Sequence, residues 1–397
     1  MAFVYKELKV FSPKDNLRID ETFKVAGVVP NANDTLAELE SESHDPELAP
    51  GTGFLNFRTK AHITAGLITV KSPPDTEYLL VANHKGEVIL LNAIGDKLNP
   101  VWNVNVPGTI YRTPVIVDEH AFVVTKQGFL AAISIKFDSN GHPLPGTITW
   151  EKNLGLTVFS KLLTTGRILI VAAISAIQAY DCYFSGENAT GTFGEKLWEH
   201  KLNGLVSSPA IDGSSLFIGS EDKQLYALRY GGEGASSLWS YKTDGPIRSK
   251  PCISIKGNSV LVGSLDGFVY SFDRVTGQLI WSFPARSAVQ SDIVSFVIGN
   301  DEFFLFGNDD GTFFCLNTYG KQQWSFKTNG RIRSEAMISG DLVFFGSEDN
   351  HLYGLKTITG QLYLKYNTDG NLNGKPVICG NRLYIGSTDS FVHGVYI

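Results

Sequence analysis

The sequence has only four cysteines, Cys182, Cys252, Cys315 and Cys379, and no two of them are close together in the chain. Successive cysteines are 70, 63 and 64 residues apart, which matches neither a CxxC redox motif nor a zinc-binding motif. The eight histidines also occur singly. We therefore predict no metal site and expect free thiols packed inside strands.

Long hydrophobic runs and clusters of basic residues are also missing. The longest apolar stretch, Ile168–Ile177, is too short to span a bilayer. The N-terminal segment MAFVYKELKVF lacks the apolar core of a signal peptide. The formal net charge is −6 and no run of five basic residues occurs. These absences predict a soluble, cytoplasmic protein with no membrane span and no nucleic-acid partner.

Motifs of the common enzyme classes are absent as well. The chain has no GxSxG elbow, no HExxH pair, no Walker lysine loop and no calcium-loop spacing. Gly232-Glu233-Gly234 lacks the third glycine of a dinucleotide-binding loop. We predict no cofactor from these residues.

The tryptophans that are present recur with a regular period. All six, Trp102, Trp150, Trp198, Trp239, Trp281 and Trp324, are separated by 48, 48, 41, 42 and 43 residues, and Leu364 occupies the next position, 40 residues on. A period of this length, with several short strands in each unit, is typical of the blades of a β-propeller. We expect the tryptophans to pack neighbouring blades together rather than bind a ligand.

The best-preserved unit runs from Pro251 to Trp281 and reads PCISIKGNSVLVGSLDGFVYSFDRVTGQLIW. Its alternating apolar residues are bounded by Asn, Asp and Gly turns, as a four-stranded antiparallel sheet requires. The pattern Gly-Ser-x-Asp-Gly-x-x-Tyr-x-x-Asp-x-x-Thr-Gly-x-x-x-Trp resembles the PQQ-like repeat of quinoprotein-type propellers, a family that includes the bacterial outer-membrane-assembly lipoprotein. The resemblance is strong from Leu205 to the C-terminus and looser from Ala61 to Leu202. Such repeats specify fold better than function.

Eight units can be counted, so the predicted fold is all-β, an eight-bladed propeller of four-stranded antiparallel blades; seven blades remain an alternative if one early repeat is misread. The last unit ends after three strands at Ile397. We expect the N-terminal strand, residues 1–11 with Phe3–Phe11 at its centre, to supply the fourth and close the ring, which removes open sheet edges. The propeller itself is predicted to span residues 54–397.

Between these parts lies an acidic insertion, residues 12–53. It holds nine acidic residues against three basic ones. We predict either a lid over one face of the propeller or a docking arm, and the alternative is a solvated, partly disordered segment.

The segments that enter the inner strands should line a central funnel. Aligned on a recurrent proline (Pro114, Pro209, Pro251, Pro376), the residue one position earlier is Ala61, Thr113, Lys161, Ser208, Lys250, Asp292, Glu335 and Lys375 in blade order. The residue three positions earlier is Thr59, Tyr111, Phe159, Val206, Arg248, Gln290, Arg333 and Asn373. Strand alternation puts both columns on the same side. The predicted ligand-binding funnel therefore comprises Tyr111, Phe159, Lys161, Arg248, Lys250, Gln290, Asp292, Arg333, Glu335 and Lys375.

Two interpretations of this funnel stay open. It is either a ring of inter-blade salt bridges, with Lys250 paired to Asp292 and Lys375 to Glu335, or a basic pocket for an anionic ligand or acidic peptide. The leading functional hypothesis is a non-catalytic propeller that binds a protein or peptide partner through its loop face. The alternative is an enzyme or small-molecule-binding protein that anchors an anionic ligand, with Asp292, Glu335 or Lys250 as candidate catalytic groups. A PQQ-dependent dehydrogenase is a weaker alternative, because the adjacent cysteine pair of those enzymes is missing.

Overall fold

The computed structural model describes residues 55–72, 76–95, 97–182, 193–231 and 234–397. All of them belong to one compact unit, Pro50–Ile397. They form strands and turns without a helix. No helix among them is long and apolar enough to cross a membrane.

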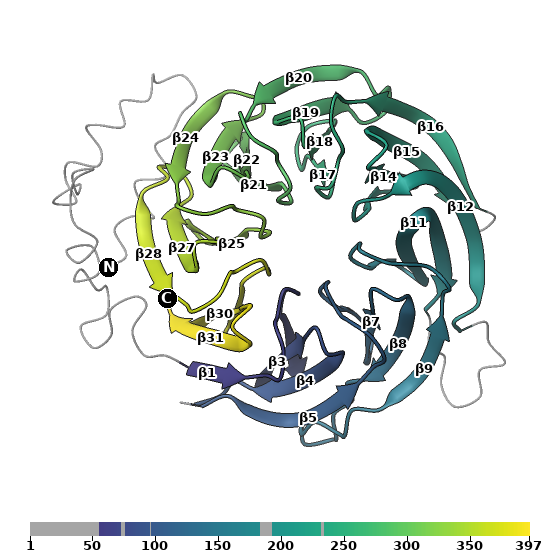
Figure 1. Cartoon of the computed structure of the whole chain (residues 1–397), viewed down its shortest axis with the longest axis vertical. Helices are drawn as coiled ribbons and strands as arrows, with labels where there is room; N and C mark the ends of the chain where they lie inside the picture. Colours follow the sequence, from purple (N-terminus) through teal and green to yellow (C-terminus); the bar gives the residue numbers. More distant parts are fainter. Residues whose placement is uncertain (1–54, 73–75, 96, 183–192, 232–233) are drawn as a thin grey trace. The chain divides into compact units, whose positions relative to one another are not determined.

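Eight antiparallel sheets surround a central axis as the blades of a propeller (Figure 1). This confirms the predicted fold class and the count of eight over seven.

The blades are numbered in chain order, and each is given from its inner to its outer strand. Blade 1 is β2 (Ile68–Ser72), β3 (Thr76–Ala82), β4 (Glu87–Asn92) and β5 (Asn99–Asn105), and blade 2 is β6 (Val115–Val117), β7 (His120–Val124), β8 (Phe129–Ser134) and β9 (Ile148–Asn153). Blade 3 is β10 (Leu163–Thr165), β11 (Ile168–Asp181) and β12 (Lys196–Leu205), and blade 4 is β13 (Ala210–Asp212), β14 (Ser215–Gly219), β15 (Gln224–Gly231) and β16 (Gly234–Lys242).

The second half of the ring follows the same order. Blade 5 is β17 (Cys252–Ile253), β18 (Ser259–Gly263), β19 (Phe268–Asp273) and β20 (Leu279–Pro284), and blade 6 is β21 (Val294–Ile298), β22 (Asp301–Gly307), β23 (Thr312–Asn317) and β24 (Gln322–Lys327). Blade 7 is β25 (Met337–Ser339), β26 (Leu342–Gly346), β27 (His351–Lys356) and β28 (Leu362–Asn367), and blade 8 is β29 (Val377–Cys379), β30 (Arg382–Gly386), β31 (Phe391–Tyr396) and β1 (Leu55–Arg58).

Blade 3 departs from the pattern because one long strand, β11, takes the place of two. Ser175 has a φ of +62° at the middle of β11, where the chain reverses. The backbone N–H of Cys182 donates to the carbonyl of Arg167 at 2.8 Å, so the two ends of β11 lie side by side. The longest apolar stretch of the sequence, Ile168–Ile177, thus lies in a tight hairpin.

Ring closure differs from the sequence prediction. The outer position of blade 8 is filled by β1, which pairs antiparallel with β31 in the register Leu55 with Gly394 and Arg58 with Phe391. The predicted closing strand, Phe3–Phe11, and the acidic insertion, residues 12–53, lie outside the described residues. The prediction chose the wrong segment because Phe3–Phe11 has a clear strand pattern, whereas the four residues of β1 are too short to show one.

The tryptophans of the outer strands pack against neighbouring blades, as predicted. Trp281 of blade 5 donates from Nε1 to the carbonyl of Thr318 in blade 6 at 2.9 Å. Its ring lies against Gly320, where an added Cβ would stand 2.7 Å from ring carbon Cδ2. Trp324 makes the same contacts with Thr357 and Gly360 of blade 7. Each Trp–Gly contact thus buries aromatic surface between two sheets.

Buried serines at the start of the inner strands fix the segments that face the axis. The hydroxyl of Ser249 donates to the carbonyl of Gly263 at 3.0 Å and accepts from the N–H of Gly263 at 2.8 Å. Ser291 and Ser334 repeat these bonds in blades 6 and 7. Because these serines point into their blades, the residues on either side of each serine point toward the axis.

Candidate functional site

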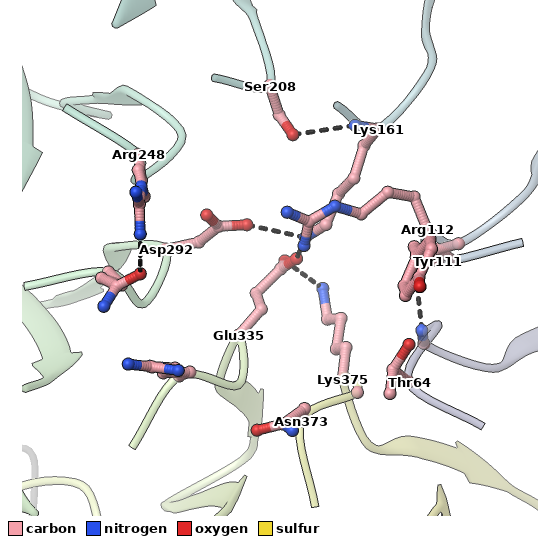
Figure 2. Close-up of a pocket in the computed structure, with 15 residues that line it drawn as sticks. Thr64, Tyr111, Arg112, Lys161, Ser208, Arg248, Asp292, Glu335, Asn373 and Lys375 are labelled. Carbon is pink, nitrogen blue, oxygen red and sulfur yellow. Dashed lines mark hydrogen bonds and ion pairs between the residues drawn. The ribbon is translucent and has the colours of Figure 1, made fainter. Parts of the chain in front are cut away.

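A cavity lies on the axis, at the face where the chain enters the inner strands. Its volume, taken as the space that a water-sized sphere can occupy, is about 40 Å³. Figure 2 shows side chains converging on it from several blades. All eight blades contribute lining residues, which are Thr64, Gly66, Tyr111, Arg112, Thr113, Lys161, Ser208, Arg248, Gln290, Asp292, Arg333, Glu335, Asn373, Gly374 and Lys375.

Eight of the ten residues predicted for the funnel line this cavity. They are Tyr111, Lys161, Arg248, Gln290, Asp292, Arg333, Glu335 and Lys375. Phe159 and Lys250 are outside the lining. Phe159 lies behind Tyr111, with 6.4 Å between the ring centroids, and Lys250 contributes its backbone N–H, which donates to Oδ1 of Asp292 at 2.9 Å.

Blade 1 enters the cavity five residues later than the alignment predicts. Thr64 and Gly66 line it, in place of Thr59 and Ala61. The residue before Thr64, Ile63, packs on Gly386 of blade 8, in the same way that Ile247 packs on Gly219 and Ile332 on Gly307. Blade 1 has no proline at the aligned position, so the sequence held no marker for the true register.

A cluster of ion pairs centred on Lys161 lies across the axis of the propeller. Nζ of Lys161, from blade 3, lies 2.6 Å from Oδ2 of Asp292 in blade 6 and 2.5 Å from Oε2 of Glu335 in blade 7. Lys375 of blade 8 lies 2.7 Å from Oε1 of Glu335. The side chains of Lys161, Asp292 and Glu335 are only 16–20% exposed. The predicted Lys375–Glu335 pair is therefore present, but the ammonium that pairs with Asp292 comes from across the ring and not from Lys250.

The charges of this cluster stabilise one another. Burial alone raises the pKa of Asp292 and Glu335, but the Lys161 ammonium outweighs burial and holds the pKa of both carboxyl groups below the usual values. Burial lowers the pKa of Lys161, and the two carboxylates outweigh it in the opposite direction. All three groups stay charged at neutral pH. Because their pKa values are lowered, Asp292 and Glu335 are not suited to proton transfer near pH 7.

Blades 4 to 7 form one rim of the cavity, and the charged side chains on this rim are linked by ion pairs and hydrogen bonds. Arg248 pairs with Glu221 and donates to Oε1 of Gln290 at 3.3 Å. Asp309 accepts two bonds from Arg333, at 2.8 and 2.9 Å. Arg333 also lies 3.5 Å from Glu348. The predicted cations Arg248 and Arg333 are therefore neutralised by carboxylates from neighbouring loops.

The opposite rim, from blades 1 to 3, is aromatic. The rings of His84 and Tyr111 are 4.5 Å apart, and Nζ of Lys126 lies 5.2 Å from the ring centre of Phe159. Nε2 of His84 is hydrogen-bonded to the hydroxyl of Thr64 at 2.7 Å. Burial, reinforced by the nearby His62, lowers the pKa of His84, so its imidazole is neutral at pH 7.

Arg112 is the charged lining residue that sequence reasoning missed. It occupies the position where blades 3 to 7 have the buried serine, and a guanidinium cannot fit there, so the side chain extends over the cavity (Figure 2). Nε donates to the carbonyl of Phe159 at 2.5 Å. Among the described residues, Nη1 and Nη2 of Arg112 have neither a hydrogen bond nor a carboxylate within 4.0 Å. The sequence indicated this difference only by having arginine, and not serine, at this position of blade 2.

The surroundings of Arg112 are unfavourable for its charge. Its side chain is exposed to solvent, yet many protein atoms lie around it, and this desolvation lowers the pKa of the guanidinium, partly offset by Asp292. An arginine remains charged even so. The molecule therefore holds a partly desolvated cation on its axis.

The described residues offer no other obvious chemical centre. No three His, Cys, Asp or Glu side chains among them are grouped to hold a metal ion. The four cysteines are buried and unpaired, and burial raises the pKa of Cys252 and Cys315 to about 12. Such thiols are protonated and unreactive at neutral pH.

Comparisons with known proteins agree with the repeat pattern. A family model described as outer membrane protein assembly factor BamB matches residues 187–310 and 309–395. A BamB of Nitrosomonas eutropha is 22% identical over 204 residues, half of this chain and 45% of that protein. A BamB of Burkholderia pseudomallei is 29% identical over 105 residues, 26% of each chain. The matches thus span less than half of the length of these curated relatives.

One solved structure extends the likeness to most of the chain. Chaetomium thermophilum Sqt1, described as bound to the N-terminus of the ribosomal protein L10, has a TM-score of 0.71 over 86% of this chain and 99% of its own, at 14% identity. At this identity the likeness shows the fold alone.

Proposed function

We propose that this chain, which belongs to the PQQ-like repeat family described as outer membrane protein assembly factor BamB, is a non-catalytic propeller that binds a protein or peptide partner through the face bearing the axial cavity. The observation that carries the proposal is a concave, polar site on the axis to which all eight blades contribute. Concave sites with a few convergent polar groups are where propellers bind partners.

The charge state of the site supports binding over catalysis. The two carboxylates in it are held ionised by Lys161, so neither is matched to general acid–base chemistry at neutral pH. The cavity floor is closed by ion pairs that join blades 3, 6, 7 and 8. A rigid floor of this kind keeps the rim residues in place for a partner.

The proposal has precedent among proteins of similar fold. The Sqt1 structure is described as bound to the N-terminus of the ribosomal protein L10, so a protein of similar fold engages a chain terminus. An anionic small molecule is the competing occupant, and it is favoured by the two terminal nitrogens of Arg112, which have no partner among the described residues.

A native mass spectrum of the chain, purified gently from its own host, tests the proposal. We expect a second polypeptide on the wild-type chain that is lost in Tyr111→Ala, at the cavity rim. It should be retained in Tyr319→Ala, because Tyr319 is 77% exposed in the β23–β24 turn at the opposite end of the blades. A bound mass of a few hundred daltons would favour the small-molecule alternative, and a bare chain would contradict both.

A further inference from the structure

Five cations line the axial cavity: Arg112, Lys161, Arg248, Arg333 and Lys375. Lys161 and Lys375 are paired to Asp292 and Glu335 at 2.5–2.7 Å. Arg248 and Arg333 are paired to carboxylates from neighbouring loops, Glu221, Asp309 and Glu348. Arg112 is therefore the lining cation that has no carboxylate within 4.0 Å among the described residues.

The donors of Arg112 are also free to bind. Its only hydrogen bond among the described residues uses Nε, which leaves the two terminal nitrogens facing the cavity. A guanidinium presents parallel N–H donors that match the two oxygens of a carboxylate. Desolvation lowers the stability of the unpaired cation, and a bound anion would remove that cost.

A second, independent feature lines the same cavity. The side-chain oxygen Oδ1 of Asn373 is buried and has no hydrogen-bond partner among the described residues. Buried polar groups are nearly always satisfied, so an unpartnered acceptor in a cavity is uncommon. The cavity thus holds two unused donors on Arg112 and one unused acceptor on Asn373, which match the carboxylate and a backbone N–H of a peptide.

We infer that the axial cavity recognises a single carboxylate of a peptide segment, with Arg112 as the specificity-determining residue; the inference rests on the proposed function and names the chemistry of the partner. One negative charge pairs with the one lining cation that lacks a carboxylate partner, whereas a phosphate dianion carries more charge than Arg112 alone neutralises. The aromatic rim of Tyr111 and His84 packs against the residue next to the carboxylate. The carboxylate is either an Asp or Glu side chain or the C-terminus of the peptide.

The test is a selection of displayed random 12-residue peptides with free C-termini against the full-length wild-type chain. The matched variants are Arg112→Met and Arg229→Met, because Arg229 is an exposed arginine of β15 without a role in the cavity. Arg112→Lys keeps the charge and removes the bidentate fork. Melting temperatures verify that each variant is folded.

We expect the enriched peptides to share one acidic residue or a required free C-terminus. Synthetic versions with Asp→Asn, Glu→Gln or an amidated C-terminus identify which carboxylate binds, and its loss should weaken binding to wild type at least tenfold. Arg112→Met should cause a similar loss, with little further loss when both changes are combined. Arg229→Met should have no effect.

Two results overturn different claims. Peptides that bind without any carboxylate, or that bind Arg112→Met as tightly as wild type, would refute the assignment of Arg112 and leave peptide binding intact. A wild-type selection without enrichment over an empty support would refute the proposed function itself.

Discussion

The ammonium of Lys161 lies 2.6 Å from Oδ2 of Asp292, and this ion pair joins blade 3 to blade 6 across the centre of the ring. Lys161 also binds Glu335 of blade 7. Contacts between blades usually link sequence neighbours, whereas this cluster connects blades that are not adjacent. Its residues line the axial cavity and form part of the candidate site.

Replacing Lys161 should therefore destabilise the whole ring. Lys161→Met leaves two largely buried carboxylates without their main partner, and we expect a loss of about 2–3 kcal/mol in the free energy of unfolding. Denaturant unfolding of the variant measures it. Lys321→Met, at an exposed turn position, is the control, with an expected change within about 0.5 kcal/mol. If Lys161→Met behaves like the control, the cluster is not a stabilising element.

The same cluster predicts how stability depends on pH. Asp292 and Glu335 have lowered pKa values in the folded chain. Their contribution to the free energy of unfolding is therefore fully present above the pKa values of the unfolded chain, about 4, and is lost as the pH falls through the pKa values of the folded chain. Lys161 has a raised pKa, so its contribution is lost only at strongly alkaline pH.

Unfolding midpoints of wild type and of the double variant Asp292→Asn/Glu335→Gln, measured from pH 3 to pH 8, test this sign. The difference between the two proteins should be constant between pH 6 and pH 8 and should shrink below about pH 4.5. A difference that grows on acidification would contradict the assignment of the ionised carboxylates.

The Trp–Gly contacts between blades are testable with two glycines of similar backbone geometry. Gly360 (φ +69°) and Gly380 (φ +64°) both adopt a left-handed conformation, but an added Cβ stands 2.6 Å from the Trp324 ring at Gly360 and meets nothing within 4 Å at Gly380. Gly380→Ala should cost about 1–2 kcal/mol for the backbone alone. Gly360→Ala should cost about 1–3 kcal/mol more, because it disrupts the blade interface.

Chemical denaturation of the two alanine variants separates these contributions. Equal losses of stability would mean that the tryptophan column does not hold neighbouring blades together.

The fold could be predicted from sequence because each blade repeats one short pattern. Trp281 and Trp324 keep the same spacing and make the same contacts, so one unit explains the next. The prediction was wrong where a repeat lacks the proline or the strand pattern used for the alignment. The entry of blade 1 was placed five residues early, at Thr59 instead of Thr64, and the closing strand was placed at Phe3–Phe11 instead of Leu55–Arg58.

The composition of the candidate site was largely predicted, but of the two predicted ion pairs only Lys375–Glu335 is present. Strand alternation identified Lys161, Asp292 and Glu335 as facing the axis, but no local pattern indicates that Lys161 reaches across the ring to both carboxylates. Arg112 was missed because alternation points that position into the blade. It faces the cavity since its size excludes it from the space that serine fills in blades 3 to 7.

The most direct test of the central claim is site-specific photo-crosslinking in the native host. A photoreactive phenylalanine analogue replaces Tyr111 at the cavity rim or, in a matched chain, the exposed Tyr319 on the opposite face. Binding through the cavity face predicts a discrete polypeptide adduct from position 111 and none from position 319. An adduct from position 319 alone, or from neither position, would contradict it.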